Sequence, residues 1–143
     1  MPFEFLDDAV TSDVTFHAWG ASLEEVFAAA ADATLNAMVR ALDAVRPIET
    51  ARVSVASDAL DLLLKRFLDD LIYRKDTDGL LLRATEVRVE NAGGRHRAVV
   101  DLAGERIDPR RHDLVADVKA VTLHDLRVER TGTGWDAHVT LDV

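Results

Sequence analysis

Hydrophobic and polar residues alternate one by one in several short segments, as they do in strands with one buried face. Residues 14–19 alternate with Val14, Phe16 and Ala18 on one side, and Gly20 ends the segment. Residues 52–56 alternate in the same way. The pattern predicts a strand in each of these two segments.

Two longer segments place hydrophobic residues three and four positions apart, which is the spacing of a buried helix face. Ser22 and Glu25 form a capping-box pattern, so we expect a helix from about residue 23 to Leu42, ahead of Pro47. Asp58 should open a second helix that Gly79 ends. The hydrophobic faces comprise Leu23, Phe27, Ala30, Thr34, Leu35, Met38 and Leu42 in the first helix, and Leu60, Leu63, Leu64, Phe67, Leu68 and Leu71 in the second.

Helical spacing is lost after Leu80, and hairpin signals follow. Residues 85–90 and 97–102 flank an Asn-Ala-Gly-Gly turn, and residues 126–128 and 135–143 flank a Thr-Gly-Thr-Gly turn. Residues 117–121 form another strand candidate. The segment from 104 to 114 is the one substantial loop candidate.

Two amphipathic helices and several hairpin strands predict an α+β fold. Both helices should pack on one face of a mostly antiparallel or mixed β-sheet. The chain has 143 residues and no change of composition along its length, so we expect one domain spanning residues 1–143.

The composition narrows the classes of partner. With 17 Lys and Arg against 26 Asp and Glu, the formal net charge is −9, which disfavours strong direct binding of nucleic acid. An acidic surface suits a basic protein or a cation, although such a charge can also serve only solubility. Cysteine is absent, which excludes disulfides and thiolate chemistry.

Neither a secretory signal nor a membrane-spanning segment is recognisable. The first eight residues lack a basic region followed by a hydrophobic one, and no hydrophobic run approaches the length of a membrane span. We therefore expect a cytoplasmic protein without a membrane partner.

The last predicted strand alternates to the final residue, with Asp142 and His138 on its polar side. This pattern predicts that the end of the chain is held in the sheet, with the Asp142 carboxylate beside the oxygens of Val143. Crowded oxygens of this kind need a cation, and Ca²⁺ or Mg²⁺ prefers oxygen ligands. The alternative is that Asp142 is an ordinary solvated edge residue.

Asp7, Asp8 and Asp13 form a second concentration of carboxylates. Asp13 comes directly before the first predicted strand, so it and Asp142 could share a cation if the first and last strands are neighbours. Asp13 could equally cap a turn.

Lys119 lies among hydrophobic residues of a predicted strand, where its amine must reach solvent or pair with a carboxylate. His112 and His124 bracket the same region, and each taken alone is a surface or hydrogen-bonded residue rather than a ligand.

Catalytic motifs are missing: the sequence contains no glycine-rich phosphate loop, no nucleophile elbow and no closely spaced histidine pair. We therefore expect that the protein is not an enzyme. One alternative is a metal-dependent phosphoester hydrolase that uses Asp7, Asp8, Asp13 and His17. Another is an acidic chaperone or adaptor.

Several segments together resemble one family, the archeases. They are Phe5-Leu6-Asp7, Asp13-Val14, His17 to Gly20, Ser22 to Phe27, Leu68 to Tyr73, Asp78 to Leu80, Gly104-Glu105, Asp108, His112, Val118 to Thr122, His124 and Leu141 to Val143. The Val-Lys-Ala-Val-Thr run and the terminal Leu-Asp-Val are the most specific parts.

This resemblance implies a protein that helps an RNA ligase of the RtcB type, which joins tRNA halves through a guanylylated histidine and manganese. Archeases promote guanylylation and turnover of that ligase. The resemblance also implies a divalent ion, calcium with Mg²⁺ or Mn²⁺ as alternatives, held by Asp13, Asp142 and Val143. Asp7, Lys119 and His112 match further family positions that could support the site or contact the partner.

The opening departs from the family pattern. Archeases usually have Asp-His-Thr-Ala-Asp there, whereas this chain has residues 7–13 with two additional positions and no histidine. Asp13 keeps its place before the strand, and the difference bears on Asp7 and Asp8.

Overall fold

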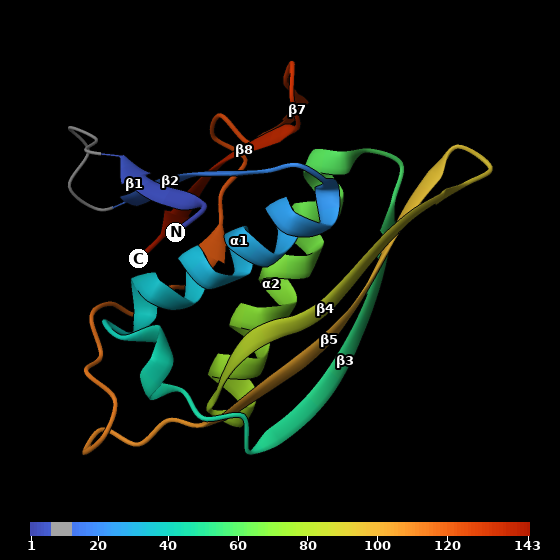
Figure 1. Cartoon of the computed structure of the whole chain (residues 1–143). Coiled ribbons are helices and arrows are strands. Elements are labelled where there is room, and N and C mark those ends of the chain that lie inside the picture. Colours follow the sequence, from blue (N-terminus) through green and yellow to red (C-terminus); the bar gives the residue numbers. More distant parts are fainter. Residues whose placement is uncertain (7–12) are drawn as a thin grey trace.

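A computed structural model describes residues 1–6 and 13–143 (Figure 1). Within these described residues, two α-helices and eight strands follow one another as β1 (Phe3–Leu6), β2 (Asp13–Gly20), α1 (Leu23–Met38), β3 (Glu49–Ser57), α2 (Leu60–Asp78), β4 (Leu80–Ala92), β5 (Arg95–Arg106), β6 (Ala120–Val121), β7 (Arg127–Arg130) and β8 (Trp135–Asp142). A short 3₁₀ helix covers Leu42–Ala44. The α+β class is confirmed.

The strands form two antiparallel sheets, a division that the sequence pattern does not reveal. The larger sheet has five strands in the order β1-β2-β8-β6, and β7 also pairs with β8. β8 is therefore the central strand, although it comes last along the chain. Its predicted alternation is confirmed, because Ala137, Val139 and Leu141 are buried in the core.

The smaller sheet has the order β3-β5-β4. Its β4–β5 hairpin turns at Gly93 and Gly94, whose φ angles of 62° and 77° match the type I′ turn that joins two-residue hairpins. Gly104 in β5 is required by close packing, since an added Cβ would lie 1.8 Å from the Leu81 carbonyl oxygen.

Both helices contact strands of both sheets and lie between them in Figure 1. α1 is consequently buried around most of its circumference, and five of its buried residues are alanines: Ala29, Ala30, Ala31, Ala33 and Ala37. Small side chains let two layers approach one helix from different sides. A helix with a single hydrophobic stripe could pack against only one of the two layers.

Three local predictions need correction. α1 ends at Met38 rather than near Leu42, because residues 38–40 leave the helix and pair with residues 113–115 through backbone hydrogen bonds. The N-cap of α2 is Ala59 and not Asp58, whose carboxylate accepts from Arg95. The strand predicted at 117–121 is confined to its last two residues. Gly79 ends α2 in the left-handed conformation as expected.

The predicted loop begins later than expected, since β5 extends to Arg106. None of the helices in the described ranges is long and hydrophobic enough to cross a membrane.

Candidate functional site

Asp13 and Asp142 are direct partners across the β2–β8 pair. Opposite residues of an antiparallel pair direct their side chains to the same face, so the two carboxylates share one face of the sheet. Both residues are partly buried. From the sequence, a cation shared by Asp13 and Asp142 requires the first and last predicted strands to be neighbours. The strand order meets this condition.

Lys119 and Val143 lie at the same end of β8. The Lys119 backbone N–H donates to the Asp142 carbonyl oxygen over 2.8 Å, and Ala120 pairs opposite Asp142 on the other side from Asp13. Val143 follows directly and is partly buried. Three segments far apart in sequence therefore meet around Asp142. Asp7 and Asp8 lie outside the described residues.

The electrostatics at this end of the sheet are unfavourable without a counter-charge. Within residues 1–6 and 13–143, neither the Asp13 nor the Asp142 side chain forms an ion pair or a hydrogen bond. Like charges directly opposite each other destabilise a strand pair. A divalent ion with a preference for oxygen would neutralise both carboxylates.

The donors at this site are oxygens, which suit such an ion, but they are few. Within the part of the chain that the structure describes, no group of three or more His, Cys, Asp or Glu side chains has a geometry for holding a metal ion. The available donors are thus two carboxylates and main-chain oxygens such as that of Val143. Ca²⁺ accepts backbone carbonyls and water alongside carboxylates.

The buried lysine of this protein is Lys75 and not Lys119. Lys119 is exposed, whereas Lys75 is 9% exposed and its Nζ donates to Asp117 Oδ1 over 2.6 Å and to the Val118 carbonyl oxygen over 2.7 Å. Burial by itself lowers the pKa of Lys75, but the hydrogen bonds to Asp117 and Asp76 outweigh it and the pKa is raised. Lys75 therefore anchors the chain just ahead of Lys119 as a cation.

Asp69 of α2 fixes the other side of this segment. Its Oδ1 accepts from the Val121 backbone N–H over 3.1 Å, and its Oδ2 accepts from Lys65 over 2.6 Å. Two charged residues of α2, Asp69 and Lys75, therefore hold the segment 117–121, which includes Lys119, beside Asp142.

His17 does not join Asp13. Its Nε2 lies 2.9 Å from Asp136 Oδ2, and its Nδ1 lies 3.6 Å from Glu4 Oε1. Four residues of extended strand separate Asp13 from His17 by roughly 13 Å. The described part of the constellation suggested for a hydrolase is therefore not assembled. His124 is exposed and lies 3.5 Å from Asp125.

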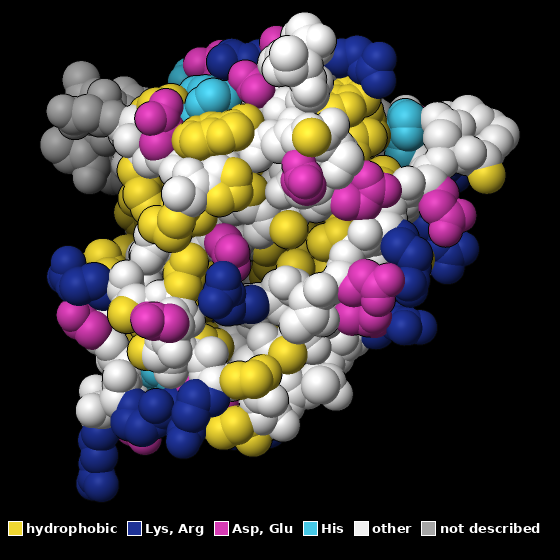
Figure 2. All heavy atoms as spheres, viewed as in Figure 1, with side chains coloured by type: hydrophobic (Ala, Val, Ile, Leu, Met, Phe, Trp, Pro, Cys, Tyr) yellow, Lys and Arg dark blue, Asp and Glu magenta, His cyan; other side chains and the backbone are white. Residues whose placement is uncertain are grey.

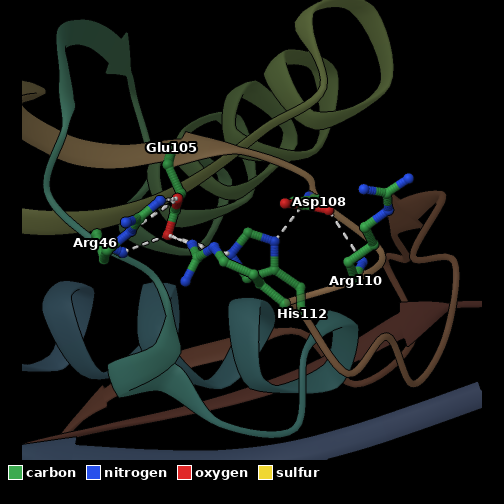
Figure 3. A network of polar contacts seen from close by, with 6 residues as sticks. Arg46, Glu105, Asp108, Arg110 and His112 are labelled. Atoms are coloured by element: carbon green, nitrogen blue, oxygen red, sulfur yellow. Dashed lines mark hydrogen bonds and ion pairs between the residues drawn. The ribbon is translucent and has the colours of Figure 1, made fainter.

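His112 belongs to a separate buried cluster around Glu105 (Figure 3). His112 is 2% exposed and Glu105 is 5% exposed. The Asp108 backbone N–H donates to His112 Nδ1 over 2.9 Å, which leaves Nε2 as the protonated nitrogen that donates to Glu105 over 3.2 Å. Both ring nitrogens of His112 are thus used in hydrogen bonds that fix the turn after β5, and neither is free to bind a metal.

Arg46 and Arg111 complete this cluster. The Arg46 backbone N–H donates to Glu105 over 2.7 Å, its guanidinium donates over 3.1 Å, and Arg111 pairs with the same carboxylate. Burial alone raises the pKa of Glu105, but these donors and His112 more than reverse that effect, and the pKa lies well below its usual range. Both oxygens of Glu105 therefore have partners, and the carboxylate is ionised at neutral pH.

The fold and this geometry define a class: a small α+β protein with a carboxylate pair facing across two strands at the end of its central strand. The family model of the archease protein family (MTH1598/TM1083) matches residues 3–143, so the chain belongs to the archease family.

Curated relatives agree with this assignment. Protein archease of Pyrococcus abyssi is 34% identical over 134 residues, which cover 93% of this chain and 94% of the relative. Protein archease of Methanopyrus kandleri is 33% identical over 145 residues and is covered completely, as is this chain.

Solved structures share the fold. The solution structure of protein 1598 from Methanobacterium thermoautotrophicum has a TM-score of 0.85 at 33% identity and covers 99% of each chain. A crystal structure from Thermotoga maritima, described as an archease and possible chaperone, has a TM-score of 0.64 over 96% of this chain and 98% of its own. At 18% identity, that likeness concerns the fold alone.

Proposed function

We propose that this protein activates an RtcB-type RNA ligase, promoting its guanylylation and turnover, through a divalent metal at Asp13, Asp142 and the main-chain oxygen of Val143. The protein itself performs no catalysis in this proposal. The observation that carries it is the direct cross-strand pairing of Asp13 with Asp142, because two partly buried carboxylates that have no counter-charge among the described residues are suited to bind a cation. Ca²⁺ is the expected ion, with Mg²⁺ or Mn²⁺ as alternatives.

Lys119 contributes a second charge at the same end of β8. Its backbone is tied to Asp142, and its exposed side chain is available to a partner. A divalent ion reduces charge at a transferring phosphate, and a lysine amine can contact the same group. We expect the Asp142 end of the sheet to meet the ligase near its nucleotide, with residues 117–121 held for contact by Asp69 and Lys75.

The test follows the covalent guanylate on the ligase from the same organism, with labelled GTP and Mn²⁺, in the presence and absence of this protein. We expect faster guanylylation and more than one turnover with the wild-type protein. The Asp142→Asn variant should lose at least 90% of the stimulation while keeping the circular dichroism of the wild type. The matched control is Asp101→Asn, which removes a carboxylate from the other sheet.

Two results would reject the proposal. The first is an absence of stimulation at every ratio of protein to ligase. The second is full stimulation by Asp142→Asn, which would separate the carboxylate pair from the function.

A chaperone or adaptor role is the second candidate, suggested by the formal net charge of −9. It predicts suppression of aggregation of an unrelated unfolding protein, measured by light scattering. Retention of that effect in Asp142→Asn, together with no effect on the ligase, would favour this candidate over the first.

A further inference from the structure

A groove with a volume of about 790 Å³ lies on a different part of the surface from Asp142. It is bounded by the end of β2, the first half of α1 and the turn between β7 and β8. Figure 2 shows this face, with hydrophobic side chains in a hollow and acidic side chains at its margin. The groove has no role in the proposed ligase site.

The backbone gives the groove a fixed shape. An added Cβ on Gly134 would lie 2.2 Å from the Gly20 carbonyl oxygen, so the β7–β8 turn sits directly against the end of β2. The Trp19 N–H also donates to the Pro2 carbonyl oxygen over 3.0 Å. A ligand would therefore meet a preformed surface, which lowers the ordering cost of binding.

Both tryptophans of the chain line this groove. Trp19 and Trp135 are partly buried, so each keeps some of its indole accessible. Indole faces attract cations and guanidinium groups in particular. The chain already shows this contact, because the Arg130 guanidinium lies 5.1 Å from the centre of the Trp135 ring.

The charged residues that line the groove are acidic. Glu25, Asp32 and Asp136 contribute carboxylates, while no lysine or arginine is among the lining residues. Arg83 offsets Asp32 through two hydrogen bonds of 3.0 and 3.1 Å. Glu25 and Asp136 form no ion pair with lysine or arginine within the described residues, and Asp136 Oδ2 lies 2.9 Å from His17 Nε2.

The start of α1 does not turn this groove into an anion site. One of its free N–H groups, that of Glu25, donates to Ser22 Oγ, and the Glu25 carboxylate accepts from the Ala21 N–H just before the helix. The capping box therefore places a carboxylate where the helix end would otherwise favour an anion. The groove combines aromatic faces with negative charge, which is the chemistry of an arginine-binding site.

We propose that this groove binds an arginine-rich segment of a partner protein. A guanidinium would stack on the exposed indole surface of Trp19 or Trp135 and pair with the Glu25 or Asp136 carboxylate. Arg130 makes the same kind of stacking contact with Trp135, although it is not among the residues that line the groove. This proposal is independent of the ligase proposal, because it concerns other residues and its test contains no ligase.

The experiment titrates the full-length protein with a short peptide of alternating arginine and glycine and follows tryptophan fluorescence, which reports only on this groove. We expect saturable binding that weakens as salt rises. The double variant Glu25→Gln and Asp136→Asn should weaken binding at least tenfold. The matched control, Glu86→Gln and Asp101→Asn, removes the same charge from the other sheet and should change affinity less than twofold.

Two further arms decide the nature of the occupant. Arg130→Gln uncovers the part of the Trp135 ring that Arg130 contacts and removes a positive charge beside the groove, so binding of the peptide should tighten. The proposal is wrong if both double variants weaken binding equally, since the effect would then reflect net charge alone. Saturable binding of a uridine oligonucleotide at the groove, with no binding of the arginine peptide, would also overturn it.

Discussion

The protein contains two concentrations of acidic chemistry that the fold treats in opposite ways. Glu105, in the buried cluster, accepts hydrogen bonds from Arg46, Arg111 and His112. Asp13 and Asp142 face each other across two strands, and within the described residues their side chains have no basic partner. The chain neutralises the Glu105 carboxylate, whereas no basic side chain among the described residues neutralises Asp13 or Asp142.

This difference separates a structural site from a functional candidate. A buried carboxylate is stable only when it is paired. Both oxygens of Glu105 accept hydrogen bonds that hold the turn after β5 in place. Among the described residues nothing offsets the repulsion between Asp13 and Asp142, and local conflicts of this kind are expected at functional sites. His112, which the sequence suggested as a support for the metal site, belongs to the first group.

The largest effect is expected from breaking the buried cluster. Glu105→Ala leaves Arg46, Arg111 and His112 without their shared acceptor and should destabilise the protein by about 3 kcal/mol. Urea unfolding followed by circular dichroism measures this loss. The matched control is Glu49→Ala, which removes an exposed glutamate that lies 3.6 Å from Arg106 and should cost less than about 1 kcal/mol. Equal losses in the two variants would mean that the buried cluster is not special.

The second prediction concerns how the free energy of unfolding depends on pH. Because the pKa of Glu105 is lowered by folding, its contribution is complete above the ordinary pKa of glutamate, about 4.3, and declines as the pH falls below that value. The stability difference between the wild type and Glu105→Gln should therefore be constant from pH 7 to about 5. Below about pH 4.3 it should shrink by at most about 1.4 kcal/mol per pH unit.

Urea midpoints of both proteins across this range provide the measurement. A difference that grows on acidification would reverse the assigned direction of the pKa shift.

The smallest expected effect is a gain in stability rather than a loss. Asp13→Asn removes one of two facing like charges, so in EDTA it should stabilise the protein by roughly 0.5 kcal/mol. Addition of Ca²⁺ should raise the Tm of the wild type, because an ion that binds only the folded state stabilises it, and should leave the variant unchanged. Thermal unfolding with and without Ca²⁺ measures both effects.

The control for this experiment is Asp101→Asn. Asp101 accepts from Arg52 over 2.7 Å, so its loss should not stabilise the protein in EDTA. If Asp13→Asn is destabilising in EDTA and responds to Ca²⁺ like the wild type, the pair is not a metal site.

The sequence predicts the local elements well, because their signals are local. The Ser22–Glu25 capping box marks the start of α1, Gly79 marks the end of α2, and the two glycines at 93 and 94 mark a tight hairpin. The alternation of β8 also holds, since one side of the strand faces the core.

Predictions that depend on distant partners fare less well. The early end of α1 reflects pairing of residues 38–40 with 113–115, which no helical period encodes. Lys119 lies between hydrophobic residues in the sequence and Lys75 lies between Arg74 and Asp76, yet the packing of α2 against residues 117–121 makes Lys75 the buried one. The carboxylates of the candidate site could be named from sequence, but their adjacency depends on strand order.

The central place of β8 also bears on how the molecule is made. β2 leaves the ribosome early, yet its neighbour in the sheet follows more than a hundred residues later, on the order of ten seconds at ordinary rates of synthesis. During that interval β2 is bordered only by β1, and a two-stranded hairpin is barely stable alone. The nascent chain therefore carries an open strand edge, which is a template for unwanted pairing with its neighbours on the same polysome.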